Sequence, residues 1–89
     1  MAWRYELDLS DIWEAAWADE ITAQELALRV AARIRAMETL PSGRKIHAIL
    51  AVFEELAEDE TATFYDIDGP YNALCDWGDW ERVWIKTMG

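Results

Sequence analysis

The chain has 89 residues, a hydrophobic fraction of 53% and a formal net charge of −10, from 8 basic and 18 acidic residues. This length predicts a single domain over residues 1–89, and the six tryptophans argue against a disordered chain, because disordered chains are poor in aromatic residues. The acidity argues against direct binding to nucleic acid or to anionic membranes, since those surfaces require clustered lysine and arginine.

The N-terminal segment predicts a strand and then a short helix. Residues 2–8 alternate in polarity, which is typical of a half-buried strand with Trp3, Tyr5 and Leu7 on one side. Ser10 is placed to cap a helix over residues 11–18.

A second helix is predicted over residues 23–37. Thr22 and Glu25 form the capping-box pattern that precedes a helix. One apolar stripe then recurs at spacings of three and four residues and comprises Ala23, Leu26, Val30, Ile34 and Met37.

The motif LPSG at residues 40–43 predicts a break, after which Ser42 would cap a third helix over residues 43–58. Beyond it we expect a helical turn at residues 62–67 and a separate helix over 70–77. Proline favours the first turn of a helix, so Asp68 would cap this last helix and Gly78 would end it.

The C-terminal residues 81–87 alternate again and predict a terminal strand, with Val83 and Ile85 on one side and Trp84 on the other. If it pairs with the N-terminal strand, its basic side chains can lie opposite Glu6 or Asp8. The predicted fold is therefore α+β and mainly α: three to four short helices packed on a small two-stranded ribbon formed by the N- and C-terminal strands.

Catalytic and metal-binding patterns are weak. His47 is the single histidine, and its place at the edge of an apolar helix face favours a partly buried structural role. Cys75 precedes an aspartate, whose negative charge disfavours a reactive thiolate, so we expect a packed small side chain. The motif DIDG at residues 66–69 lacks the later ligands of a calcium loop and favours a turn with an aspartate cap. We therefore expect no enzyme activity, no cofactor and no metal.

Acidic residues are dense in two segments. The helix dipole disfavours negative charge at a helix C-terminus, so helix stability alone does not explain the first segment. Rows of carboxylates can present charge as a phosphate backbone does, and can occupy a groove built for nucleic acid. Two alternatives stay open: the acids serve solubility alone, or Asp59 and Glu60 serve the following turn. The first segment comprises Glu54, Glu55, Glu58, Asp59 and Glu60, and the second Asp66, Asp68, Asp76, Asp79 and Glu81.

The six tryptophans divide into two groups. Trp3, Trp13 and Trp17 fall on apolar faces and are expected in the core. The other three, Trp77, Trp80 and Trp84, lie among acids, and exposed tryptophan beside charge is typical of an interface hot spot. Trp80 is expected in a turn before the last strand, where it could anchor a partner together with Asp79.

The segment YNALCDWGDWERVWIKT, with FEELAEDE before it, resembles small acidic proteins of phages and mobile elements, among which the anti-CRISPR proteins are a well-known group. The resemblance implies a non-enzymatic inhibitor that binds a host nucleoprotein complex and blocks its DNA or guide-RNA groove. Anti-CRISPR proteins share no common motif, so no residue role is transferred from them.

The resulting hypothesis is a small acidic inhibitor, monomer or homodimer, that binds the basic groove of a nucleic-acid-binding host complex by charge mimicry and steric block. We expect it in the cytoplasm, since its N-terminus lacks a signal-peptide pattern and no apolar run could span a membrane. The alternative is a helical interaction module, such as an antitoxin-like protein or phage assembly adaptor, that uses an exposed tryptophan patch. In the first hypothesis, that of the acidic inhibitor, the residues that bind the partner are Glu54, Glu55, Glu58, Asp59, Glu60, Asp66, Asp68, Asp79 and Trp80.

Overall fold

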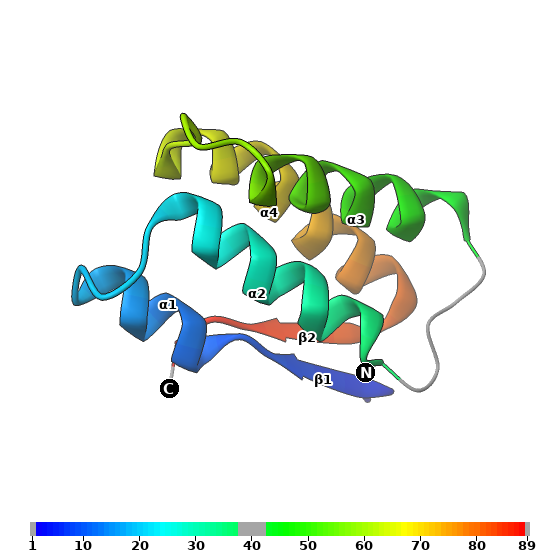
Figure 1. The fold of residues 1–89 in the computed structure, drawn as a ribbon. Helices are drawn as coiled ribbons and strands as arrows, with labels where there is room; N and C mark the ends of the chain where they lie inside the picture. Colours follow the sequence, from blue (N-terminus) through cyan, green and yellow to red (C-terminus); the bar gives the residue numbers. More distant parts are fainter. Residues whose placement is uncertain (1, 38–42, 89) are drawn as a thin grey trace.

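The computed structural model describes residues 2–37 and 43–88, which form four helices and one two-stranded sheet (Figure 1). The predicted α+β, mainly helical architecture is confirmed. The cap proposed at Ser42 lies outside the described residues, and the third helix follows Gly43 as its N-cap. The elements in chain order are β1 Tyr5–Asp8, α1 Ser10–Trp17, α2 Ala23–Arg35, α3 Arg44–Ala57, α4 Phe64–Glu81 and β2 Val83–Lys86.

The terminal strands pair with each other, as predicted, and the pairing is parallel with Asp8 opposite Lys86. Parallel strands require a long connection, and here all four helices lie within it. Figure 1 shows the two strands along one side of the molecule, with α2, α3 and α4 above them in the view and α1 beyond the end of β1. The expected opposite charges also meet across the ribbon, because Lys86 Nζ lies 3.8 Å from Glu6 Oε1.

The helices alternate in direction, and this places two turns at one end of the molecule. Figure 1 shows the α1–α2 turn and the α3–α4 turn at the same end, and the starts of both strands at the other. A side-chain contact ties the two pairs of helices together there: Gln24 Nε2, in the first turn of α2, donates to the carbonyl oxygen of Ala57 at 3.1 Å. That bond satisfies one of the carbonyls left unpaired at the end of α3.

The core is built from one face of each long helix. The whole stripe predicted for the second helix is buried, including Met37 just beyond its end. Phe53 of α3 and Leu74 of α4 are completely enclosed. Each such side chain contributes about 1.5–3 kcal/mol to folding through the hydrophobic effect. The buried apolar residues of α2 and α3 are Ala23, Leu26, Ala27, Val30, Ala31, Ile34, Ile46, Ile49, Leu50 and Phe53.

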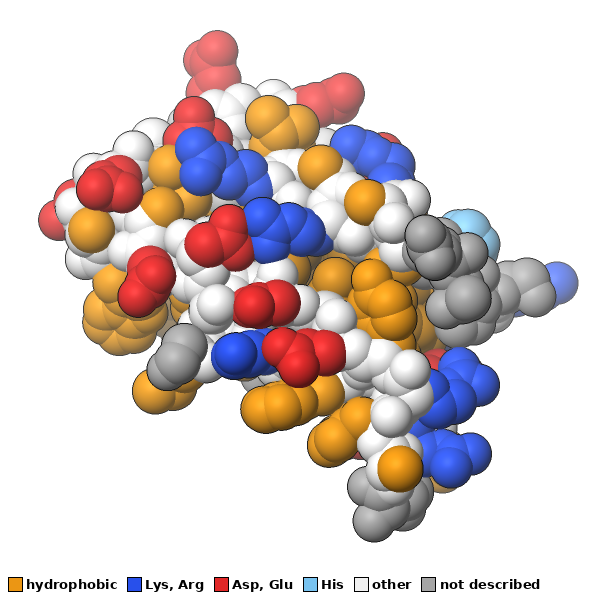
Figure 2. Space-filling view, turned by 90° about the horizontal axis from the view of Figure 1, so that it is seen from below, with side chains coloured by type: hydrophobic (Ala, Val, Ile, Leu, Met, Phe, Trp, Pro, Cys, Tyr) orange, Lys and Arg blue, Asp and Glu red, His pale blue; other side chains and the backbone are white. Residues whose placement is uncertain are grey.

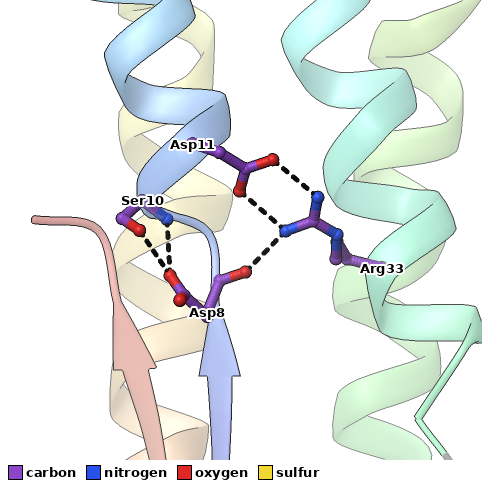
Figure 3. A network of polar contacts seen from close by, with 4 residues as sticks. All are labelled: Asp8, Ser10, Asp11 and Arg33. Carbon is purple, nitrogen blue, oxygen red and sulfur yellow. Dashed lines mark hydrogen bonds and ion pairs between the residues drawn. The ribbon is translucent and has the colours of Figure 1, made fainter. Parts of the chain in front are cut away.

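Arg33 fixes the position of α1 against β1 and α2 (Figure 3). Its Nη1 donates to Asp11 Oδ1 at 2.9 Å and to the Asp8 carbonyl oxygen at 2.7 Å, and its Nη2 donates to Asp11 Oδ2 at 2.8 Å. The prediction that Ser10 caps α1 is wrong, because Ser10 is the first helical residue. Asp8 Oδ1 instead accepts hydrogen bonds from the Ser10 hydroxyl at 2.6 Å and N–H at 2.9 Å, and these lower the pKa of Asp8. The cap predicted at Thr22 is confirmed by a 3.2 Å bond from the Glu25 N–H to Thr22 Oγ1.

The longest helix, α4, contradicts the predicted break at Gly69–Pro70 and runs through it without interruption. Proline removes one backbone N–H and disfavours a helical conformation in the residue before it, partly by a clash with the Cβ of that residue. Gly69 has no Cβ, so that part of the clash is absent. Burial on both sides of the proline then favours one continuous helix, through Ile67, Leu74 and Trp77.

The N-terminus of α4 lies earlier than predicted. Asp68, expected as a cap, is inside the helix, and Thr63 is the N-cap. The Thr63 N–H donates to Asp66 Oδ2 at 2.9 Å, and the Thr63 hydroxyl lies 3.2 Å from the same oxygen. The motif at residues 66–69 is therefore the first part of a helix and not a turn.

The C-terminus of α4 lies later than predicted. Gly78, expected to end the helix, is buried within it, where an added Cβ would lie 2.5 Å from the carbonyl oxygen of Val83. Glycine is needed here for close packing of α4 against the start of β2. The helix ends at Glu81, because Arg82 adopts the left-handed conformation, with φ 59° and ψ 41°, that turns the chain into β2.

The tryptophans that are buried differ from those predicted to be buried. Trp3 and Trp17 were expected in the core but are 50% and 84% exposed, so that prediction is wrong. Trp17 is the last residue of an eight-residue helix, one turn beyond Trp13, which is half-buried and packs on the core. Trp77, of the group expected near the surface, is only 3% exposed, because α4 continues through it.

Candidate functional site

Because the helices alternate in direction, many acidic residues lie at the end of the molecule that carries the α1–α2 and α3–α4 turns. We call this the acidic end. Figure 2 shows Asp and Glu side chains as the outermost charges over this end, and Lys and Arg side chains over the opposite one. It combines the α1–α2 turn, the end of α3, the α3–α4 turn and the start of α4. Its residues are Asp19, Glu20, Glu54, Glu55, Glu58, Asp59, Glu60, Asp66 and Asp68.

All eight basic side chains are in the described part of the chain. Six of them form ion pairs among the described residues, and only one such pair involves the acidic end, with Arg35 Nη1 2.7 Å from Glu54 Oε2. The negative charge of the acidic end is therefore largely uncompensated by neighbouring cations. The acids without an ion pair among the described residues there are Asp19, Glu20, Glu55, Glu58, Asp59, Glu60, Asp66 and Asp68.

Two of these acids also hold the local backbone. Asp59 Oδ1 accepts hydrogen bonds from the Thr61 hydroxyl at 2.6 Å and from its N–H at 2.9 Å, and these lower the pKa of Asp59. Asp66 accepts the Thr63 N–H at the start of α4, where a carboxylate also interacts favourably with the helix dipole. The suggestion that Asp59 serves the following turn is thus confirmed, and both side chains remain exposed or half-exposed anions.

Two of the predicted binding residues lie elsewhere. Asp79 and Trp80 are in the last turn of α4, not in a turn of the chain. Asp79 is eleven positions beyond Asp68, which corresponds to about 16 Å along the helix axis at a rise of 1.5 Å per residue. Trp80 is 80% exposed, and Trp84 on β2 is 46% exposed on the face opposite buried Val83, as predicted for that strand. These residues are therefore separate from the acidic end.

A groove of about 390 Å³ opens beside the acidic end, between α1 and α4. Its floor includes Leu26 of α2 and Ile67 of α4, which are 1% and 4% exposed. Its size falls within the range of about 300–1,000 Å³ typical of ligand sites. The groove is lined by Trp13, Ala16, Trp17, Asp19, Leu26, Phe64, Ile67, Asp68 and Tyr71.

Aromatic rings form both walls of this groove. The rings of Trp13 and Tyr71 meet with their centroids 5.1 Å apart and an angle of 44° between their planes. The Tyr71 hydroxyl lies 3.3 Å from Thr87 Oγ1, and burial raises the pKa of Tyr71, so the phenol stays neutral at physiological pH. Trp17 and Phe64 are 84% and 45% exposed, which leaves apolar surface available beside the carboxylates.

The candidate catalytic residues are not assembled into a site. His47 is exposed on α3, so the expectation of a partly buried structural histidine is wrong. Cys75 is a half-buried free thiol on α4. Among residues 2–37 and 43–88, no cluster of three or more His, Cys, Asp or Glu side chains is arranged to hold a metal ion. In the same part of the chain, no helix combines the length and the apolar character needed to cross a membrane.

Asp19, Glu20 and the groove were not predicted from the sequence. The residues of the groove walls recur at helical spacing in the sequence, with Trp13, Ala16 and Trp17 on one helix and Phe64, Ile67 and Tyr71 on the other. That spacing indicates two apolar faces but does not show that they remain partly apart. The sequence feature that could have indicated Asp19 is the short turn between α1 and α2, residues 18–22. Figure 1 shows this turn at the same end of the molecule as the α3–α4 turn.

No protein-family model matches the chain, and comparisons with curated proteins and with solved structures gave no match either.

Proposed function

We propose that this protein is a non-enzymatic inhibitor that occupies the basic groove of a nucleic-acid-binding protein or complex, as an anti-CRISPR or other anti-defence inhibitor would. It acts by negative-charge mimicry and steric block. The observation that carries the proposal is the acidic end, where eight carboxylates lie without an ion pair among the described residues. Their combined field attracts a cationic surface from a distance and disfavours anionic partners.

The position of the charges supports this mode of binding. The acidic end joins two turns and the adjoining helix ends, and only Asp19 and Asp68 of its nine acids line the groove. The other seven are exposed or half-exposed, so a cationic cleft can reach them. Acids that served solubility alone would be expected to spread over the surface among the basic residues, whereas nine acids gather here and only one of them forms an ion pair among the described residues.

The test is capture of partners from host lysate, followed by competition with nucleic acid for each purified partner. The proposal predicts that the protein displaces the partner's nucleic acid in an electrophoretic mobility assay, and that binding weakens at least tenfold between about 50 and 500 mM salt. A stable ternary complex with bound nucleic acid, or an affinity unchanged by salt, would contradict it.

A second candidate is the helical interaction module with a tryptophan patch. Trp77 is buried and cannot belong to the patch, but exposed Trp80 and Trp84 still favour a contact surface at the far end. Size-exclusion chromatography with tryptophan fluorescence separates the candidates. A stable dimer in which Trp80→Phe removes the change in fluorescence on association supports the module, and a monomer at all concentrations contradicts its homodimeric form.

A further inference from the structure

The groove between α1 and α4 has a composition that the charge mimicry of the acidic end does not require. Its walls present Trp13, Trp17, Phe64 and Tyr71, and carboxylates enter the lining from two sides. Asp19 comes from the α1–α2 turn and Asp68 from the second turn of α4. A surface that only repels anions and attracts cations gains nothing from this aromatic lining.

Charge complementarity selects the occupant. Neither Asp19 nor Asp68 has an ion pair among the described residues, although both line an otherwise apolar groove. Aromatic faces attract cations, tryptophan most strongly, and the planar guanidinium of arginine stacks on them while donating to carboxylates. A purely aliphatic occupant would leave the two carboxylates beside apolar surface without partners, which is unfavourable.

We propose that this groove binds an arginine side chain presented by an exposed segment of a basic partner protein. The guanidinium stacks against the aromatic walls and donates to the carboxylates of Asp19 and Asp68. The inference deepens the proposed function and rests on it for the identity of the partner, since it names the side chain that a basic groove would insert. The acidic end supplies the long-range attraction, and the groove supplies the specific contact.

The chain offers substitutions that change the groove and leave the fold in place. Asp19 adopts the left-handed conformation with φ 58°, which asparagine also tolerates, so Asp19→Asn removes the charge without new backbone strain. Asp68 is exposed on α4, so Asp68→Asn should also remove the charge and leave the fold in place. Trp17→Ala has a matched control in Trp80→Ala, because the two side chains are 84% and 80% exposed.

The experiment titrates the full chain with four short peptides of glycine and serine that differ in one central residue: arginine, citrulline, lysine or norleucine. Binding is followed by the NMR shifts of the Trp13 and Trp17 indole N–H groups and of the Asp19 and Asp68 amides. We expect the arginine peptide to bind at least tenfold more tightly than its neutral citrulline counterpart and more tightly than the lysine peptide. Asp19→Asn with Asp68→Asn, or Trp17→Ala, should lower that affinity at least fivefold, and Trp80→Ala should leave it unchanged.

Equal affinity for arginine and citrulline, equal affinity for arginine and lysine, tighter binding of norleucine, or shifts spread over the acidic end without the indoles would each overturn the proposal. The outcome is distinguishable from failure of the proposed function. Selective arginine binding in the groove, without inhibition of any nucleic-acid-binding protein, would reject the function and keep the groove. Inhibition that survives Trp17→Ala and the two asparagine substitutions would reject the groove and keep the function.

Discussion

Arg33 and Asp11 form a two-point ion pair, with Nη2 2.8 Å from Oδ2 and Nη1 2.9 Å from Oδ1. This guanidinium also bonds the Asp8 carbonyl oxygen and so links the end of β1 to α1 and α2 (Figure 3). The hydrogen bond with Asp11 raises the pKa of Arg33, and the reverse interaction lowers the pKa of Asp11. Asp11 thus has a structural partner, which the carboxylates of the acidic end largely lack.

Asp11→Asn should lower the free energy of unfolding at pH 7 by about 0.5–1 kcal/mol, a small value because both side chains are more than a third exposed and screened by water. The pKa of Asp11 is depressed in the folded state, so its stabilisation is complete above the unfolded value of about 4 and is lost as pH falls through the folded value. Urea unfolding from pH 7 to pH 2 checks this. Glu55→Gln is the control, because it removes a carboxylate without an ion pair among the described residues and keeps the pair of Asp11 with Arg33. If the free energy of unfolding falls by the same amount between pH 7 and pH 2 in both variants, the role of Arg33 is contradicted.

Gly78→Ala should destabilise the protein by about 2–3 kcal/mol, because its Cβ would meet the Val83 carbonyl oxygen at 2.5 Å in a packed interior. The comparison is Gly69→Ala, where an added Cβ meets nothing within 4 Å beyond the chain neighbours. There the gain in helix propensity and the clash with the following proline oppose each other, so the net change should stay within about 1 kcal/mol. Urea unfolding of both variants measures the difference. Equal stabilities would show that α4 and β2 do not pack this closely.

Pro70→Ala should raise the free energy of unfolding by about 1–2 kcal/mol, since it restores a helical N–H in the middle of α4 and removes the steric conflict of the ring. Part of the gain is offset because proline also restricts the unfolded chain. Thermal unfolding followed by circular dichroism measures the change. A loss of stability would indicate that Gly69–Pro70 ends one helix and begins another, as the sequence suggested.

The helices with strong local signals were predictable, and the reason is visible in α2. Its cap at Thr22 and its apolar stripe specify both the start of the helix and its buried face, independently of the rest of the chain. The alternation of residues 2–8 and 81–87 predicted both terminal strands, but it did not predict the parallel direction of their pairing. The error at Gly69–Pro70 arose because the local rule for proline was outweighed by packing of Ile67, Leu74 and Trp77 on one continuous face.

The candidate site was only partly predictable. The acids around Glu58 were visible as a dense run, but the small number of ion pairs that they form depends on the directions of four helices. Asp79 and Trp80 were grouped with them because they are acidic and aromatic, yet the length of α4 separates them. The groove depends on the distance between two helix faces, which no residue spacing specifies.

The central claim is that the acidic end is the surface that a cationic protein recognises. It predicts that affinity for the partner depends on where the negative charges lie, and not on the net charge alone. Two triple variants separate these effects. Each removes three negative charges, the first from the acidic end and the second from the C-terminal part of α4. One is Glu55→Gln, Glu58→Gln and Glu60→Gln; the other is Asp76→Asn, Asp79→Asn and Glu81→Gln.

The second variant also breaks the surface ion pairs of Asp76 with Lys45 and of Glu81 with Arg4, at a cost of at most about 1 kcal/mol each, so both variants should fold. The decisive measurement is the dissociation constant of each variant for the captured partner at low salt. We predict a loss of affinity of at least tenfold for the acidic-end variant and less than threefold for the other. Equal losses, or a larger loss in the Asp76, Asp79 and Glu81 variant, would contradict recognition through the acidic end.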